Sequence, residues 1–173
     1  MAVPPPNAAS ARALRERKAQ LDRILSDELP RNRREIQEAK EFGDLSENFE
    51  YESARNRERQ LLAKLETLQR EIREAAEFDF SLAEAGEEAA PGTRVELRFE
   101  DGTERVLNIL GLWDFDEELC VISAHAPLAQ LVIGRKAGDS VSVPDPDFDG
   151  EFLSATVVSV GPLPAEVVAW ANG

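Results

Sequence analysis

The fold is decided by the stretch Phe42-Gly43-Asp44-Leu45-Ser46-Glu47-Asn48. On both sides of this stretch apolar residues recur mostly in steps of three, four or seven, which is the period of one face of an α-helix. The repeat before it consists of Leu14, Leu21, Leu25, Leu29, Ile36 and Ala39, and the repeat after it consists of Tyr51, Ala54, Leu61, Leu65, Leu68, Ile72 and Ala75. Because two amphipathic helices joined by a short turn fold back on each other, the sequence predicts an antiparallel coiled-coil hairpin over residues 10–78, with an acidic tip at residues 43–48.

The positions of the two repeats also predict the register of the hairpin. With the turn near Leu45, apolar residues face apolar residues: Leu29 faces Leu61, Leu25 faces Leu65, and Leu21 faces Leu68. The polar exception is Glu58, which faces Asn32 beside Pro30, where the first helix is expected to kink or break. Two interpretations of this polar layer stay open: it fixes the register, or it is a splayed and solvated spot beside the kink.

Two carboxylates, Asp44 and Glu47, stand three positions apart in the tip. One interpretation is a capping box, in which Asp44 accepts a hydrogen bond from a helix amide and Glu47 reaches back to the turn. The other is a pair of metal ligands, since carboxylates at this spacing reach a common point and hard oxygen atoms suit Mg²⁺. Two carboxylates alone do not make a tight Mg²⁺ site, so the second interpretation requires a partner that already holds metal and phosphate.

The tip segment closely resembles a motif of the Gre family of bacterial transcript-cleavage factors. Residues 39–51, followed by Ala54-Arg55, match the family's pattern A-R-x-x-G-D-L-S-E-N-A-E-Y-x-A-A/A-K, with Phe49 in place of the usual Ala. The resemblance implies that the hairpin enters the secondary channel of RNA polymerase, where Asp44 and Glu47 help to hold the second catalytic Mg²⁺. The turn-shaping residues would then be Gly43, Leu45, Ser46 and Asn48. The implied result is cleavage of the 3′ end of backtracked nascent RNA by the polymerase.

Basic residues follow the tip on both arms, and Arg55, Arg59 and Arg34 are the candidates for contact with the RNA. Arg55 and Arg59 stand four positions apart on one helix face. Two interpretations stay open: a solvated face whose charges are balanced by neighbouring Glu residues, or a patch that attracts RNA phosphates, as the resemblance implies.

The charge of the chain is concentrated in its second half. The net charge is −14, and residues 1–78 carry 15 Lys+Arg and 16 Asp+Glu whereas residues 79–173 carry 5 and 18. So acidic a second half argues against free duplex DNA as a partner and favours a large partner with a basic or apolar surface.

The single cysteine, Cys120, excludes an internal disulfide, and no apolar run is long enough to span a bilayer. We therefore expect a cytoplasmic, monomeric protein with no membrane partner.

The second half predicts a small α+β domain with an antiparallel sheet over residues 93–160. Strand patterns cover residues 93–99 and 103–110 around the turn Asp101-Gly102, then residues 119–123, 139–143 and 152–160, with one short helix at 127–133. This part resembles the FKBP-like C-terminal domain of the Gre family. The sequence also predicts a disordered lead-in at residues 1–9, a linker at 79–92 and a tail at 161–173.

In the Gre family, the loop before the short helix docks on the rim of the polymerase channel. That resemblance makes His125, Ala126, Pro127 and Leu128 the docking candidates, although Ala126 stands where Ser is usual. His125 has no companion His, Cys or acidic cluster at ligand spacing, so it is interpreted as structural or docking.

The preferred function is an accessory elongation factor that stimulates the polymerase's own nuclease and binds no cofactor stably, sharing Mg²⁺ with the polymerase active site. No nucleophile–base pair is visible that would make it an enzyme by itself. One alternative is a related protein that occupies the same channel and inhibits or regulates the polymerase without stimulating cleavage. A second alternative is a prolyl isomerase or chaperone, and a third is a coiled-coil dimerisation protein.

Overall fold

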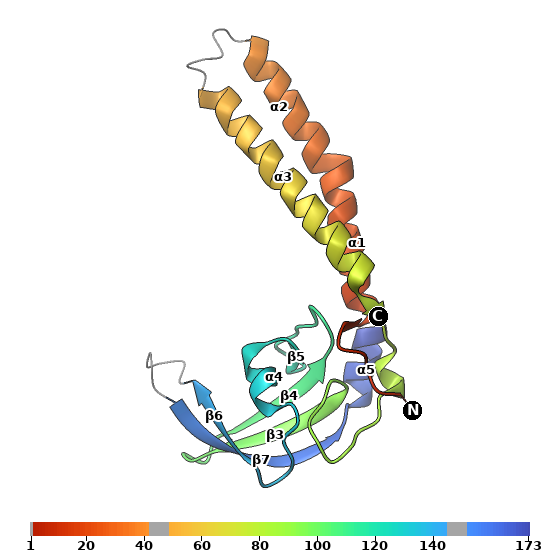
Figure 1. Ribbon diagram of the computed structural model, residues 1–173, viewed down its shortest axis with the longest axis vertical. Coiled ribbons are helices and arrows are strands. Elements are labelled where there is room, and N and C mark those ends of the chain that lie inside the picture. The colour runs from red at the N-terminus through yellow and green to blue at the C-terminus, as the bar shows by residue number, and fades with distance from the viewer. Residues whose placement is uncertain (1, 42–48, 145–151) are drawn as a thin grey trace. The chain divides into compact units, whose positions relative to one another are not determined.

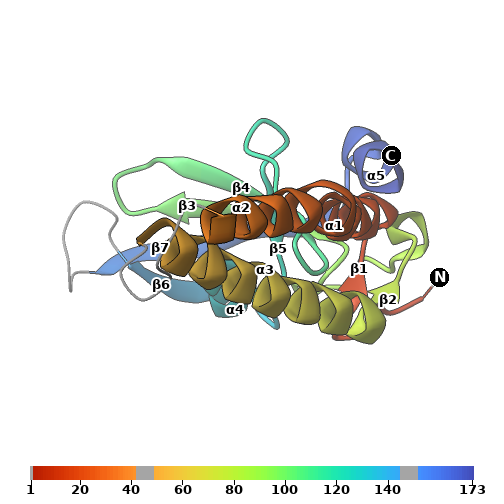
Figure 2. The same ribbon diagram turned by 90° about the horizontal axis from the view of Figure 1, so that it is seen from above.

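The computed structural model describes residues 2–41, 49–144 and 152–173. The chain divides into a hairpin unit, residues 15–74, and a sheet unit, residues 1–14 with 75–173. The elements that build the hairpin unit are α1 (Ala11–Arg23), the π-helical turn η1 (Ile24–Glu28), α2 (Leu29–Glu41) and α3 (Phe49–Glu74). Both views show α2 and α3 side by side (Figures 1 and 2), which confirms the predicted helical hairpin.

The interior of the hairpin is a narrow apolar row. Its buried members are Ile24, Leu29, Leu61 and Leu68, with Leu21 and Leu65 packed against them. The cluster agrees with the predicted pairing of Leu29 with Leu61 and of Leu21 with Leu68. The prediction for Leu25 is wrong: this side chain is 47% exposed, and Ile24 takes the interior position.

The turn η1 explains why Ile24 replaces Leu25. In a π-helix each amide bonds to a carbonyl five residues back, and the Leu29 amide donates to the Ile24 carbonyl oxygen. The step from Ile24 to Leu29 therefore brings both side chains to the same face. Pro30 follows directly in α2, so its missing donor and its ring fall where the α-helical ladder is already interrupted. The expected break is thus a π-turn inside an otherwise continuous helical path.

The polar layer beside Pro30 is buried. Asn32 is 1% exposed, and its Nδ2 atom donates to the carbonyl oxygen of Ala54 on the opposite helix at 3.0 Å. Glu58, predicted to face Asn32, instead forms an ion pair with Arg55 on its own helix. The solvated interpretation is therefore wrong for Asn32, and the cross-helix bond to Ala54 is of the kind that fixes a register.

The main element of the sheet unit is a five-stranded sheet in the order β5-β4-β3-β7-β6. Its strands are β3 (Thr93–Phe99), β4 (Glu104–Leu110), β5 (Val121–Ser123), β6 (Ser140–Pro144) and β7 (Phe152–Pro162). Every pairing is antiparallel except β4 with β5, which is parallel. The predicted α+β class is confirmed. The prediction of an antiparallel sheet is wrong for β5: residues 111–120 bring the chain back from the end of β4 to the level of Asn108, so β5 runs in the same direction as β4.

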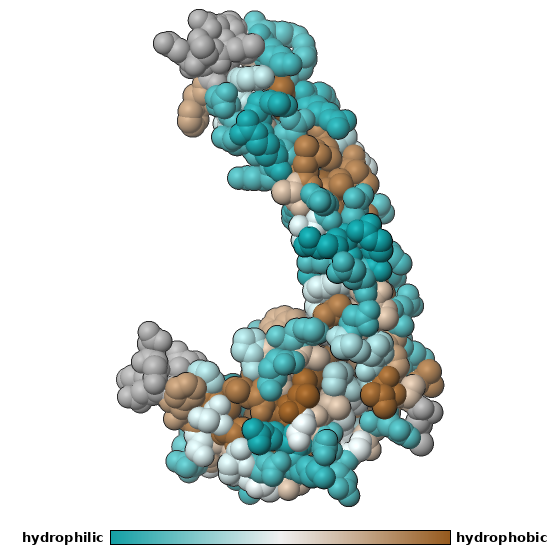
Figure 3. Space-filling view, viewed as in Figure 1, coloured by the Kyte–Doolittle hydropathy of each residue, from teal (hydrophilic) through white to brown (hydrophobic). Residues whose placement is uncertain are grey.

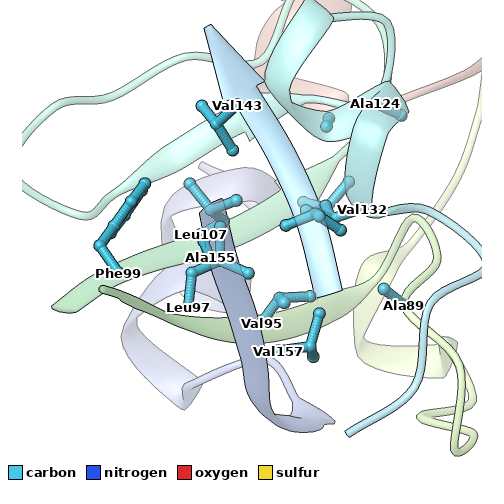
Figure 4. Packing of buried hydrophobic residues seen from close by; sticks show 13 residues of the cluster. Ala89, Val95, Leu97, Phe99, Leu107, Ala124, Val132, Val143, Ala155 and Val157 are labelled. Carbon is cyan, nitrogen blue, oxygen red and sulfur yellow. The ribbon is translucent and has the colours of Figure 1, made fainter. Parts of the chain in front are cut away.

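One face of this sheet carries the largest core of the protein. Side chains from β3 and β7, including Val95, Leu97 and Val157, point into the same interior as Val132 of α4 (Pro127–Val132), as Figure 4 shows. All four are 0% exposed. The alternation of buried and exposed residues along β3 and β6 follows the two-residue period that the sequence predicts.

A second cluster draws on the predicted lead-in, linker and tail segments. β1 (Ala8–Ala9) pairs in parallel with β2 (Ala76–Glu77), and α5 (Ala165–Asn172) buries Val167 and Ala171 against Phe80 and Leu110. Two expectations are therefore wrong: residues 2–9 are not a disordered lead-in, and residues 79–92 are not a simple linker. The sequence predicts a tail at 161–173 without deciding its packing, and in the structure it packs back through α5. Parallel pairing and burial of Phe80 in the short helix η2 (Phe80–Leu82) order these segments.

Ser10 joins the start of α1 to this second cluster. Its hydroxyl donates to the Oδ1 atom of Asp114 at 2.5 Å and accepts from the Ala13 amide at 3.0 Å, so Ser10 caps the helix. The other carboxylate oxygen of Asp114 accepts from the Gly111 amide. Both Ser10 and Asp114 are buried, so this polar contact is shielded from water.

Candidate functional site

The acidic tip lies in the link between the two paired helices. α2 ends at Glu41 and α3 begins at Phe49, so residues 42–48 join them. The predicted metal-side acids Asp44 and Glu47 lie outside the described residues, together with the turn-shaping candidates Gly43, Leu45, Ser46 and Asn48. Across the described ranges, no three His, Cys, Asp or Glu side chains gather in a way that would hold a metal ion.

The three arginines predicted to contact RNA already have partners within the hairpin. Arg55 pairs with Glu58, and the Arg59 Nη1 atom donates to the Asn56 side-chain oxygen at 2.8 Å. The Nε atom of Arg34 donates to the Pro30 carbonyl at 3.4 Å. The contacts of Arg34 and Arg59 are exposed and that of Arg55 is partly buried; surface contacts of this kind contribute little, so the guanidinium groups stay available to a phosphate at a small cost.

Sequence reasoning named Phe49 as a departure from the family pattern but did not connect it with Ser53 and Arg57 farther along α3. Phe49, Ser53 and Arg57 follow each other at intervals of four residues and are all exposed, Phe49 to 84%. Hydrophilic residues cover most of the hairpin face that is visible in Figure 3. The four-residue spacing of Phe49, Ser53 and Arg57 could have shown that they share one side of the helix. The predicted arginines Arg55 and Arg59 were instead chosen because they share an adjacent side.

The predicted docking loop contains two exposed and two partly buried side chains. His125 and Pro127 are exposed, whereas Ala126 and Leu128 pack against the core of the sheet. The Nε2 atom of His125 lies 3.1 Å from the Pro6 carbonyl oxygen, which only accepts, so this nitrogen carries the proton. The loop therefore offers His125 and Pro127 to a partner, while Ala126 and Leu128 hold the start of α4 in place.

Both parts of the chain match the same family. The model described as "Transcription elongation factor, N-terminal" matches residues 8–76, and the model described as "Transcription elongation factor, GreA/GreB, C-term" matches residues 84–161. Over 140 residues the chain is 39% identical to the transcription elongation factor GreA of Acidiphilium cryptum, a match that covers 80% of this chain and 88% of the relative. The chain belongs to the GreA/GreB family of transcription elongation factors.

A second GreA relative agrees with this assignment. The GreA of Treponema pallidum is 35% identical over 134 residues, covering 77% of this chain and 82% of the relative. The solved Gfh1 protein of Thermus thermophilus, a GreA factor homologue, is 18% identical with a TM-score of 0.41, covering 88% of this chain and 97% of that chain. Membership in the GreA/GreB family confirms the resemblance that the tip indicates, and the protein is a transcription elongation factor. None of the described helices is long and apolar enough to cross a membrane.

Proposed function

We propose that this chain binds RNA polymerase, inserts its hairpin into the secondary channel and stimulates cleavage of backtracked nascent RNA. In this role the protein is an accessory factor to the polymerase's own nuclease and has no activity alone. The observation that carries the proposal is the position of Asp44 and Glu47 in the link between α2 and α3, two helices packed against each other as one hairpin.

The chemistry of the acidic pair suits such a role. Asp44 and Glu47 would provide two hard oxygen ligands to a Mg²⁺ ion held in the polymerase, with its remaining ligands from that enzyme, RNA and water. A metal shared in this way activates water and stabilises the leaving oxygen in phosphoryl transfer. The residues of this chain would bind and orient, and the hairpin would bring them to the RNA 3′ end.

The test is a cleavage assay on stalled elongation complexes. Wild type should shorten the RNA, whereas Asp44→Asn/Glu47→Gln should lose most of this stimulation while still competing with wild type for the polymerase. A matched control is Glu66→Gln, an exposed acid farther along α3, which should cleave like wild type. Cleavage that survives the double substitution would refute the proposed role of the tip.

A second candidate function is inhibition of the polymerase from the same channel. The observation that favours it is the exposed ring of Phe49, which follows the tip where the family usually has Ala. A bulky ring at that point would change how the tip fits a narrow channel. Strong inhibition of RNA synthesis by wild type with no shortening of the RNA would establish this alternative over cleavage stimulation.

The prolyl isomerase alternative has weaker support. A groove on the sheet, of about 70 Å³, is lined by Phe99, Thr103, Arg105, Val143, Pro144 and Leu153. It holds one aromatic ring, and the Arg105 guanidinium carbon lies 5.6 Å from the centre of that ring. An isomerase pocket needs an apolar, aromatic lining for proline, which this groove lacks.

A further inference from the structure

A groove between the N-terminal segment and residues 84–91, called here the N-terminal groove, lies wholly within the sheet unit. Its volume is about 420 Å³, which is in the range of sites that hold a ligand. Its apolar lining comes from Val3, Pro4, Ala90 and Pro91. Val3 is 80% exposed, and the other three are partly buried. The N-terminal groove therefore presents apolar surface where a side chain of a partner can enter.

Backbone hydrogen bonds fix both walls of the N-terminal groove. On one wall, the Ala2 amide donates to the Leu82 carbonyl at 2.7 Å, and the Glu84 amide donates to the Ala2 carbonyl at 3.3 Å. On the other wall, the Ala89 amide donates to the Arg135 carbonyl at 2.8 Å. Because these bonds hold the walls before any partner arrives, little conformational entropy is lost when one docks.

The N-terminal wall, formed by Val3 and Pro4, precedes residue 8, where the match to the family model begins. It is nevertheless packed into the fold. At Gly92, an added Cβ atom would lie 2.4 Å from the Cβ atom of Ala83 and 3.7 Å from the Cγ atom of Pro4. Any larger side chain there would push the support of this wall apart. The wall is therefore a feature of this chain that the family match does not describe.

The rim of the N-terminal groove is acidic. Glu84, Glu87 and Glu88 stand against a single cation, Lys136, so the formal net charge of the lining is −2. The Lys136 Nζ atom lies 3.4 Å from a Glu88 carboxylate oxygen and 3.8 Å from one of Glu87. The Glu84 carboxylate has no such partner among the residues that the structure describes. An incoming cation can pair with Glu84 directly, and the exposed pairs of Lys136 are weak enough to rearrange.

The charge of the surrounding chain decides which kind of partner this groove fits. Residues 79–173 carry 5 Lys+Arg and 18 Asp+Glu, so the field around the groove is negative. Phosphates of a nucleic acid or a lipid surface are repelled there, whereas a basic segment of a protein is attracted. A bare cation would leave the apolar lining in water, and the described residues gather no three acids in a way that would hold a metal ion. The lining therefore fits a protein segment that presents a cationic and an aliphatic side chain together.

The N-terminal segment connects this groove with the predicted docking loop. Pro4 lines the groove, and two residues later the Pro6 carbonyl oxygen lies 3.1 Å from the Nε2 atom of His125. His125 and Pro127 are the exposed members of that loop. Consecutive prolines thus join the two surfaces, and a partner that contacts the loop is brought close to the groove.

We propose that the N-terminal groove docks a segment of RNA polymerase that carries a Lys or Arg next to a branched aliphatic residue. The aliphatic side chain packs on Val3 and Pro91, and the cation pairs with Glu84. An apolar centre inside a charged rim is the usual arrangement of a protein–protein interface. This assignment rests on the proposed function for the identity of the partner, and it adds a second docking surface to the loop at His125.

The first experiment measures how well the full chain competes with fluorescently labelled wild type for core RNA polymerase. Glu84→Lys/Glu87→Lys should bind about tenfold more weakly at low salt, because the reversed charges repel a basic segment. The loss should shrink at high salt, where the repulsion is screened. The control Glu100→Lys/Glu166→Lys makes the same change of net charge at exposed acids elsewhere and should bind like wild type. Equal affinity of the groove variant and wild type would overturn the proposal.

A second variant tests the apolar part of the groove. Val3→Ser should weaken binding about fivefold at low and at high salt, because it removes apolar contact without changing a charge. Val158→Ser makes the same substitution at another exposed valine, on β7, and should bind like wild type. A Val3→Ser protein that binds like wild type would contradict the packing assigned to this wall.

Crosslinking identifies the occupant. In a Cys120→Ser background, Val3→Cys carries a benzophenone label, and Ser142→Cys on β6 carries the same label as a control. The label at position 3 should capture a polymerase peptide with a Lys or Arg beside Val, Ile or Leu, and the control should not. Capture of RNA or of a second copy of the chain, or no capture in a complex that forms, would overturn the proposal.

The variant of the acidic tip separates this proposal from the function on which it rests. Asp44→Asn/Glu47→Gln should lose cleavage but keep wild-type polymerase binding and the crosslink at position 3. Glu84→Lys/Glu87→Lys should recover wild-type cleavage at saturating factor, because it weakens docking alone. Failure of the wild-type chain to bind polymerase would overturn both proposals. Tight binding and full cleavage with no effect of the groove variants would overturn only this one.

Discussion

The hairpin unit and the sheet unit bury their apolar side chains to very different depths. Among the described residues, the main cluster of the sheet unit contains 13 buried side chains, most of them from the sheet and from α4, which packs on it. The hairpin's cluster contains Ile24, Leu29, Leu61 and Leu68, a single row with a buried amide next to it. The part of the chain that carries the candidate site therefore has the thinner core, and a single polar change there should have the larger consequence.

The largest expected effect is that of Asn32→Asp in this thin core. The substitution replaces an amide that donates to the Ala54 carbonyl with a carboxylate that cannot donate when ionised. An uncompensated buried charge costs about 3 to 5 kcal/mol. In urea, the helical signal in far-ultraviolet circular dichroism should be lost at lower concentration. The fluorescence of Trp113 and Trp170, both in the sheet unit, should keep its midpoint.

The control for this change is Asn56→Asp, the same substitution at an exposed position of α3. Its effect on the free energy of unfolding should stay within about 0.5 kcal/mol. If helical and tryptophan signals shift together for Asn32→Asp, the two units unfold as one and the comparison fails.

The next effect is expected from Leu97→Ala in the sheet unit. Leu97 is 0% exposed in the large cluster, and removing a buried leucine side chain costs about 3 kcal/mol. Here the tryptophan fluorescence should change at lower urea concentration, with the helical signal of the hairpin less affected. A tryptophan midpoint equal to that of wild type would show that this cluster does not support the sheet unit.

A smaller effect is expected for Ser10→Ala, which removes the cap of α1 and a donor to buried Asp114. Loss of a cap together with a buried hydrogen bond should lower the free energy of unfolding by about 2 kcal/mol. Ser142→Ala, at an exposed position of β6, should change it little. A Ser10→Ala protein as stable as wild type would mean that water replaces the lost hydroxyl.

The smallest effect concerns Glu96 on β3. The Ser159 hydroxyl, followed by Arg94, holds the pKa of Glu96 below its usual range by bonding to its ionised carboxylate. Such a lowered pKa stabilises the fold above the unfolded-state pKa, and this contribution is lost as the pH falls through the folded-state value. Ser159→Ala should raise the pKa of Glu96 in a carbon-detected NMR titration. Its small stability cost should appear at neutral pH and vanish in acid.

Most elements were predictable because their patterns are local. The alternation along residues 93–99 and the Asp101-Gly102 turn were sufficient to predict β3 and β4. The parallel pairing of β1 with β2 was not, since two short alanine-rich segments so far apart in the chain carry no periodicity of their own. Among the site residues, the partial burial of Leu128 could not be predicted, because one apolar residue near a loop signals a partner surface and a core position equally.

In the first arm of the hairpin, one additional residue in the helix makes the sequence pattern misleading. The steps of four from Leu21 through Leu25 to Leu29 suggest an unbroken α-helix, but Leu25 is exposed. The five-residue step from Ile24 to Leu29, followed by Pro30, was the signal for η1. Periodicity predicted the helix and its partner helix correctly. It could not predict where the additional residue of η1 lies, because that depends on whether Ile24 or Leu25 packs into the interior.

The turn η1 also determines which side of α2 is buried. Each residue of an α-helix turns the side-chain direction by about 100° around the axis, so the additional residue in η1 rotates all the side chains of α2 by that angle. With this rotation, Leu29, Asn32 and Ile36 share the buried side of α2. Deleting a single residue from η1 would leave the arm helical but rotate the side chains of α2 by about 100° about the helix axis. The five residues of η1 therefore determine which side chains of α2 face α3.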